Sequence, residues 1–212
     1  AQLWELAGPD LAGPDRISAI AVAPSDSNVV YLGFNNGYVA RTTNGLDPSP
    51  VWTVSANGLP GGWVSSVAVD PGDTDTAYCT ISTYGVPHVL RTTDGGTSWH
   101  SIDGIGASGV PDIPVHWIAV RPKDPNQLYA ATELGVFASD DQGATWAPAN
   151  DGLAHTVVET LDFKDDTTLV AFTHGRGAFV AELDPAPLIF FDGFESGDTG
   201  EWSETVEAPV VP

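Results

Sequence analysis

The chain has 212 residues and a formal net charge of −21, because it has 28 acidic side chains and only seven basic ones. Such a surface repels nucleic acids and anionic membranes, so we expect neither as a partner. The longest run of large apolar residues, 188–191, is far too short for membrane insertion. The lone cysteine, Cys79, excludes an internal disulfide and a multi-cysteine zinc site.

One short apolar segment recurs four times along the chain, at offsets of 47, 51 and 43 residues. Each copy ends at a proline or an aspartate, and this pattern predicts a short strand. Two further strands follow each copy, and a fourth strand follows the first three copies. The predicted first strands are 20–24, 67–71, 118–122 and 161–165; the second are 29–34, 76–82, 127–132 and 168–173; the third are 38–42, 88–92, 136–139 and 178–183; and the fourth are 51–55, 98–102 and 145–149.

Four strands in a repeat of 43–51 residues are typical of the blades of a β-propeller. The last copy has only three strands, whereas residues 3–6 look like a fourth strand without a blade. We therefore expect an all-β propeller over residues 1–183 with about four blades, the last one split between the two ends of the chain. Pairing residues 3–6 with 178–183 closes the ring and removes its exposed sheet edges.

A turn motif of the form [S/T]-x-D-x-G-x-x-W follows the third strand of two copies. The aspartate accepts backbone N–H bonds across the turn, the glycine supplies a positive φ, and the tryptophan covers the turn. We therefore interpret these residues as structural. The two complete motifs and a third, degenerate one with a longer loop consist of Thr92, Asp94, Gly96 and Trp99; Ser139, Asp141, Gly143 and Trp146; and Asn44 and Trp52.

These turns resemble the Asp-box, or BNR, repeat of sialidase-like, xyloglucanase-like and sortilin-like β-propellers, and the resemblance covers residues 1 to about 183. It implies that the boxes lie away from the active face. Sialidase-like members also use an arginine cluster and a Tyr–Glu nucleophile pair. Of the five arginines here, Arg41 and Arg91 precede the turn motif and Arg121 ends a first strand. Arg16 and Arg176 are too few for that cluster, so the sialidase activity is not implied.

Two classes of function remain open. Glycoside hydrolysis needs two carboxyl groups about 5 Å or about 6.5–9.5 Å apart, and Asp70, Asp112 and Glu133 lie where they could reach the ring face. None of them has a catalytic sequence context. We therefore expect a non-catalytic extracellular module that binds a glycan or protein ligand, or other copies of itself, without a cofactor. The alternative is a glycoside hydrolase of the Asp-box class or the carboxy-terminal fragment of one.

Calcium is the one cofactor that the acidic residues could bind. Asp73 and Asp75 lie in one turn and Asp165 and Asp166 in the equivalent turn of the last repeat. Hard cations need several converging oxygens, and solvated turns explain these acids equally well. The five histidines show no metal-ligand spacing.

The composition changes after residue 183, because residues 184–212 carry seven acids and no base. This tail resembles the Gly-Phe-Glu-Ser-Gly-Asp endings of bacterial secreted proteins, which implies a secreted or cell-surface location. Its apolar part is expected to pack on its own propeller or on a second copy, in a head-to-tail contact that forms an oligomer or filament. The apolar residues are Leu188, Ile189, Phe190, Phe191, Phe194 and Trp202.

The first residue is Ala1, and we interpret the chain as a mature protein or a fragment. Trp4 resembles the last residue of a truncated Asp box, which favours a fragment of a larger propeller.

Overall fold

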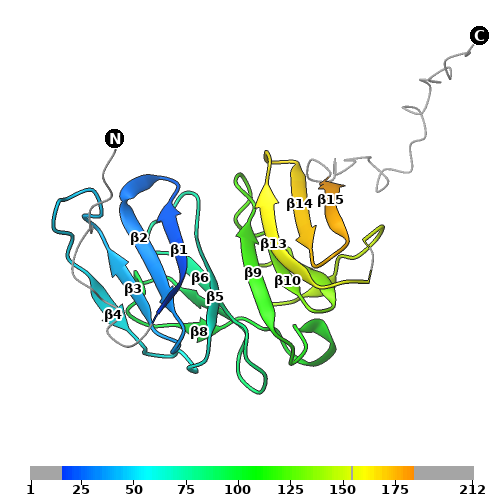
Figure 1. The fold of residues 1–212 in the computed structure, drawn as a ribbon, viewed down its shortest axis with the longest axis horizontal. Helices are drawn as coiled ribbons and strands as arrows, with labels where there is room; N and C mark the ends of the chain where they lie inside the picture. Colours follow the sequence, from blue (N-terminus) through cyan, green and yellow to red (C-terminus); the bar gives the residue numbers. More distant parts are fainter. Residues whose placement is uncertain (1–15, 154, 184–212) are drawn as a thin grey trace, which may run out of the picture.

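The computed structural model describes residues 16–153 and 155–183, which form four antiparallel sheets in chain order (Figure 1). The first three sheets have four strands each, and the last has three. The one helix in these residues is a short 3-10 turn, η1 (Gly106–Ser108). The predicted all-β class with propeller blades is therefore confirmed, as four blades of a partial propeller. In the described residues, no helix is long and apolar enough to cross a membrane.

Each blade is a meander in which consecutive strands pair with one another. Blade 1 contains β1 (Ile17–Ala23), β2 (Asp26–Phe34), β3 (Val39–Thr42) and β4 (Thr53–Ser55); blade 2 contains β5 (Val64–Val69), β6 (Ala77–Ile81), β7 (Val89–Thr92) and β8 (His100–Ser101). Blade 3 contains β9 (Val115–Val120), β10 (Leu128–Thr132), β11 (Gly135–Ser139) and β12 (Ala147–Pro148); blade 4 contains β13 (Val158–Phe163), β14 (Thr168–Thr173) and β15 (Gly177–Glu182).

The blades pack through their sheet faces, and the core lies between them. Blades 1 and 2 enclose one buried cluster that includes Tyr31 and Leu90. Blades 2 and 3 enclose a second around Tyr78 and Phe137, and blades 3 and 4 a third around Tyr129. Stacked, twisted sheets bury the alternate residues that face each other, so each blade depends on its neighbours for its core.

The first strands of all four blades lie innermost. β1 packs beside β5, β5 beside β9, and β9 beside β13. They line one groove of about 380 Å³, whose walls include Val22, Val69, Trp117 and Phe163. Since residues from all four blades line it, the blades curve around this groove.

The outer edge of β15 pairs with no described strand. We expected residues 3–6 to occupy this edge and split blade 4 between the chain ends; those residues lie outside the described part of the chain. The apolar residues 188–191, Phe194 and Trp202 also lie outside it.

Candidate functional site

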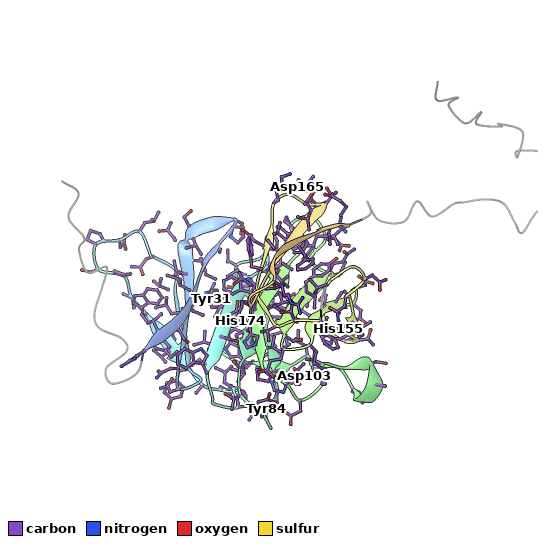
Figure 2. The ribbon with its side chains drawn as sticks, turned by 45° about the vertical axis from the view of Figure 1, so that its right-hand side comes forward. Tyr31, Tyr84, Asp103, His155, Asp165 and His174 are labelled. Carbon is purple, nitrogen blue, oxygen red and sulfur yellow. The ribbon has the colours of Figure 1, made fainter. Side chains whose placement is uncertain are left out.

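The connections between strands lie at two opposite ends of the blades. The second-to-third-strand hairpins and the blade-to-blade loops share one end, which carries Tyr84 and Asp103. The other end carries the first-to-second-strand turns, such as the one at Asp165. Figure 2 shows Tyr84 and Asp103 at the end opposite Asp165. We call the Tyr84 end the loop end and the Asp165 end the turn end.

A tyrosine and a glutamate from neighbouring blades meet at the loop end. Tyr84 lies in the hairpin between β6 and β7, and Glu133 lies in the hairpin between β10 and β11. The Tyr84 hydroxyl donates a hydrogen bond of 2.7 Å to Glu133 Oε2. This bond raises the pKa of Tyr84, so its hydroxyl stays protonated and acts as a donor at neutral pH.

An aspartate joins the same hairpin to the loop between blades 2 and 3. Asp112 Oδ1 accepts hydrogen bonds from the Gly85 backbone N–H at 2.6 Å and from His88 Nε2 at 3.1 Å. The Gly85 bond, followed by the histidine, lowers the pKa of Asp112. Asp112 is therefore an ionised acceptor at neutral pH, with its carboxylate held in a fixed position.

His88 fixes the base of this hairpin and is itself buried. Its Nδ1 lies 3.3 Å from the Ile81 carbonyl oxygen, and its Nε2 faces Asp112. The His88 backbone N–H donates to Asp103 Oδ2 at 2.9 Å, and the Val89 N–H donates to Asp103 Oδ1 at 2.6 Å. Both ring nitrogens of His88 therefore lie close to oxygen atoms, which holds the ring between Ile81 and Asp112.

Trp63 is a second exposed aromatic residue at the loop end, and its backbone lies next to that of the Tyr84 hairpin. The Trp63 carbonyl oxygen accepts a bond from the Ser82 N–H at 2.9 Å, and its N–H donates to Thr83 Oγ1 at 3.2 Å. The two residues therefore stand on adjoining backbone segments. Trp63 is 48% exposed and Tyr84 is 59% exposed, so both side chains are accessible to a ligand. We call Trp63, Tyr84, Asp112 and Glu133 the loop-end patch.

The turns that carry Asp94 and Asp141 lie at the turn end. Gly95 donates its N–H to the Asp75 carbonyl oxygen at 3.0 Å, which joins the Asp94 turn to a first-to-second-strand turn. Asp94 accepts bonds from the Thr92 hydroxyl, the Ser98 N–H and the Ser98 hydroxyl. Its turn therefore uses the whole carboxylate to hold backbone and hydroxyl groups.

The Asp141 turn repeats this geometry. Its carboxylate accepts bonds from the Ser139 hydroxyl at 2.8 Å, the Thr145 N–H at 2.8 Å and the Thr145 hydroxyl at 2.7 Å. Gly143, like Gly96, has a positive φ, and its N–H donates to the Ser139 hydroxyl. Trp99 and Trp146, which end the two turns, are both buried.

The third turn, which carries Asn44, has a longer loop. The Asn44 side-chain oxygen accepts the Thr42 hydroxyl and the Val51 N–H, both at 2.9 Å. Trp52 is partly buried against the cluster of Leu32 and Phe34 on the outer face of blade 1. This turn therefore has the same bonding pattern with an amide in place of the carboxylate.

Protonating the two turn aspartates should destabilise the fold. Bonds from Ser98 and Thr92 lower the pKa of Asp94 to about 2 from its ordinary 3.8, and Thr145 and Ser139 lower that of Asp141. A depressed folded-state pKa means that the stabilisation is complete above the unfolded pKa and is lost as the pH falls through the folded pKa. We therefore expect the melting temperature to fall steeply between pH 4 and 2, and Asp94→Asn and Asp141→Asn to lower it by several degrees at neutral pH.

Thermal unfolding followed by circular dichroism over pH 2–7 measures this. In the two variants the fall below pH 4 should be shallower than in the wild type. Asp140→Asn is the matched control, since Asp140 is exposed and adjoins Asp141. Equal acid sensitivity in all three variants and the wild type would contradict a structural role.

Three of the arginines are engaged at separate places in the fold. Arg41 pairs with Asp75 and lies over the Tyr31 ring, and Arg91 lies over the Tyr78 ring. Arg121 is buried against the turn at Asp166 in blade 4. Three of the five arginines are therefore engaged separately in holding strands and blades together.

The acids considered for calcium bind their own turns. Asp73 accepts bonds from the Asp75 N–H and the Thr76 hydroxyl, and Asp165 from the Thr167 N–H. Across residues 16–153 and 155–183, no three His, Cys, Asp or Glu side chains are grouped as metal ligands. Cys79 is buried, and burial raises the pKa of its thiol.

No family model and no curated protein sequence matches the chain. Its structure is nevertheless similar to solved propeller proteins. The GH74 xyloglucanase from Xanthomonas campestris matches with a TM-score of 0.55 at 18% identity, over 74% of this chain and 26% of the enzyme. An ancestral GH74 enzyme matches with a TM-score of 0.60 at 20% identity, over 85% of this chain and 24% of that one.

A third neighbour is the extracellular domain of a hybrid two component system from B. thetaiotaomicron. It matches with a TM-score of 0.59 at 16% identity, over 81% of this chain and 21% of that one. The chain thus spans about a quarter of the length of the proteins that it resembles. At these identities the likeness establishes the β-propeller fold.

Proposed function

We propose that this chain is a secreted, non-catalytic β-propeller module that binds a glycan at the loop-end patch. The observation that carries the proposal is the exposed Trp63–Tyr84 pair beside two carboxylates held in place by hydrogen bonds. Aromatic faces offer apolar contact area to a sugar ring, and fixed acceptors and donors orient its hydroxyl groups. The patch carries side chains of both kinds at one end of the blades.

The lowered pKa values of the aspartates favour binding of a glycan over its hydrolysis. A glycoside hydrolase needs one carboxylic acid whose pKa is raised, so that it can protonate the leaving group. Among the described residues, each aspartate with a resolved shift has a lowered pKa, Asp112 of the patch included. Asp112 is therefore an ionised acceptor in the patch, which suits the binding of sugar hydroxyl groups better than their protonation.

The Tyr84–Glu133 pair is the observation that favours an enzyme, because sialidase-like propellers use a Tyr–Glu pair as the nucleophile. Here the bond raises the pKa of Tyr84, whereas a nucleophilic phenolate needs its proton removed. The described arginines that such an enzyme would gather are engaged at other places, as with Arg41 and Arg121. We therefore keep a glycoside hydrolase as the second candidate.

The comparisons suggest the first ligands to test. One neighbour is a xyloglucanase and another is an extracellular domain, so a secreted protein that meets a glycan such as xyloglucan fits both. We also assign the turns at Asn44, Asp94 and Asp141 to the Asp-box type, and residues 184–212 to an acidic tail with an apolar, strand-like segment. The calcium site and self-association of the tail remain subordinate proposals.

Isothermal titration against a glycan panel that begins with xyloglucan oligosaccharides tests the proposal. Tyr84→Ala and Trp63→Ala should each weaken binding at least about tenfold, because each removes one aromatic contact from the patch. Phe172→Ala is the matched control, since Phe172 is exposed on blade 4. Loss of binding in the control but not in the patch variants would refute the assignment, and release of reducing sugar by the wild type would replace it with hydrolysis.

A further inference from the structure

Blade 4 differs from the other blades in the exposure of its third strand. In blades 1 to 3, most residues of the third strands β3, β7 and β11 are buried. In β15, five of the six positions are exposed and none is buried. A fourth strand covers the third one in the first three blades, and no described strand does so in blade 4.

An apolar groove accompanies this free edge. It has a volume of about 160 Å³ and lies between blades 3 and 4, beside β15 and the loop at residues 151–153. Cavities of this size are left when one large apolar side chain is removed from a core. The groove therefore has room for a side chain that the described residues do not supply.

In the neighbouring blade, the equivalent space is filled by a tryptophan. Trp146 packs in one buried cluster with Tyr78, Val89, Leu128 and Phe137, and Ile102 packs against that cluster. Five residues that line the groove occupy the positions in blades 3 and 4 that the residues around Trp146 occupy in blades 2 and 3, as the strand registers show. Those residues are Tyr129, Val136, Leu169, Phe179 and Ala149.

Two contacts support this correspondence. The Ile102 N–H donates to the Val89 carbonyl oxygen at 2.9 Å, and the Ala149 N–H donates to the Val136 carbonyl oxygen at 2.8 Å. Ala149 thus repeats the place of Ile102 at the edge of the preceding blade. The groove is the blade 4 counterpart of the socket that holds Trp146.

The spacing along the chain identifies the residue that reaches the groove. Trp146 comes seven residues after Ser139, which pairs with Leu128. In blade 4, Ala181 pairs with Leu169 at the corresponding position. The residue seven places after Ala181 is Leu188, the first of the four apolar residues 188–191.

We propose that residues 188–191 complete blade 4 as its fourth strand and that Leu188 fills the groove in the way that Trp146 fills its socket. In blade 3, Ala138 pairs with Ala147 and Phe137 with Pro148. The same register pairs Val180 with Ile189 and Phe179 with Phe190. The tail then closes the free edge of β15, which removes an edge open to other chains.

Two other occupants fit the same space less directly. Residues 3–6 carry Trp4, but residues 7–16 connect them to β1 of blade 1, at the other end of the row of blades. The tail of a second copy would carry the same Leu188. The intramolecular tail is favoured because the link from Ala181 has the length used in blades 2 and 3.

Designed cysteine pairs in the full-length protein distinguish these occupants. In Val180→Cys/Ile189→Cys, the two residues lie opposite each other in an antiparallel pair, at a distance that suits a disulfide. Val180→Cys/Phe190→Cys is the control, because neighbouring residues point to opposite faces of a strand. Glu5→Cys/Val180→Cys tests the amino-terminal segment in the register that puts Trp4 in the groove. The native Cys79 is buried and does not compete.

The expected result is a disulfide within one chain for the first pair and little for the other two, read by non-reducing electrophoresis and intact mass. A disulfide between two chains would replace our proposal with a second copy. Trapping of the Glu5 pair would replace it with the amino-terminal strand. No disulfide in any pair would overturn it.

A single substitution supplies an independent readout. Leu188→Asp places a charge in the groove and should lower the melting temperature by several degrees, whereas Val210→Asp, which places the same charge further along the tail, should leave it unchanged. Equal melting temperatures for both variants and the wild type would count against the proposal.

Discussion

Replacing Trp146 with alanine should lower the free energy of unfolding by about 3–5 kcal/mol, the usual effect of truncating a buried aromatic residue. Trp146 is only 3% exposed and packs between blades 2 and 3 with Tyr78 and Phe137. Its indole Nε1 donates a hydrogen bond of 2.7 Å to the Ile102 carbonyl oxygen. The alanine variant therefore loses apolar burial and leaves a carbonyl group unpaired.

Phenylalanine substitutions separate these two losses. Trp99 occupies the same place one blade earlier and is 1% exposed, but its indole nitrogen has no hydrogen-bond partner among the described residues. Trp146→Phe should therefore cost about 1 kcal/mol more than Trp99→Phe, the net value of one hydrogen bond. Urea unfolding measures both, with the exposed Trp63→Ala as a control. A larger loss for Trp99→Phe would contradict this account of the two sockets.

The repeat in the sequence predicted the blades because a short period of strands and turns leaves few alternatives. The repeat did not predict the residues at which the first strands begin. β5, β9 and β13 begin three residues before the recurring apolar segments, at Val64, Val115 and Val158. The first residues of these strands are of mixed polarity, and in β5 and β13 the register shifts just after the first pair. The shared pattern therefore marks the end of each inner strand and misses its start.

The loop-end patch could not be predicted in the same way. Glu133 and Asp112 were recognised as acids near the ring face, but nothing in the sequence joins Tyr84 to Glu133, which is 49 residues away. These contacts arise between blades, from hairpins whose conformation depends on the packing of the strands below them. Tyr84 and Trp63 show no repeat spacing, because the hairpins and blade-to-blade loops vary from one repeat to the next.

Arg121 offers the second large effect, because it joins blades 3 and 4 in a buried position. It is 4% exposed, and its Nε donates a bond of 2.9 Å to the Asp166 carbonyl oxygen and lies 3.8 Å from the Asp166 carboxylate. A second bond of 3.0 Å runs to the Gln127 side chain. Asp166 also accepts the Lys123 N–H, so the whole turn of blade 4 is fixed to the end of β9.

Arg121→Ala should lower the free energy of unfolding by about 2–4 kcal/mol, because it removes a buried side chain and leaves the Asp166 carbonyl oxygen and the Gln127 side chain without their charged donor. Arg121→Met retains much of the side-chain volume and should recover part of this loss, since the desolvation cost of the guanidinium is also removed. Arg16→Ala changes an exposed arginine and should stay within about 0.5 kcal/mol of the wild type. Urea unfolding of the three variants measures the contribution of Arg121 to stability. A loss below about 1 kcal/mol for Arg121→Ala would mean that apolar contacts alone hold blade 4 against blade 3.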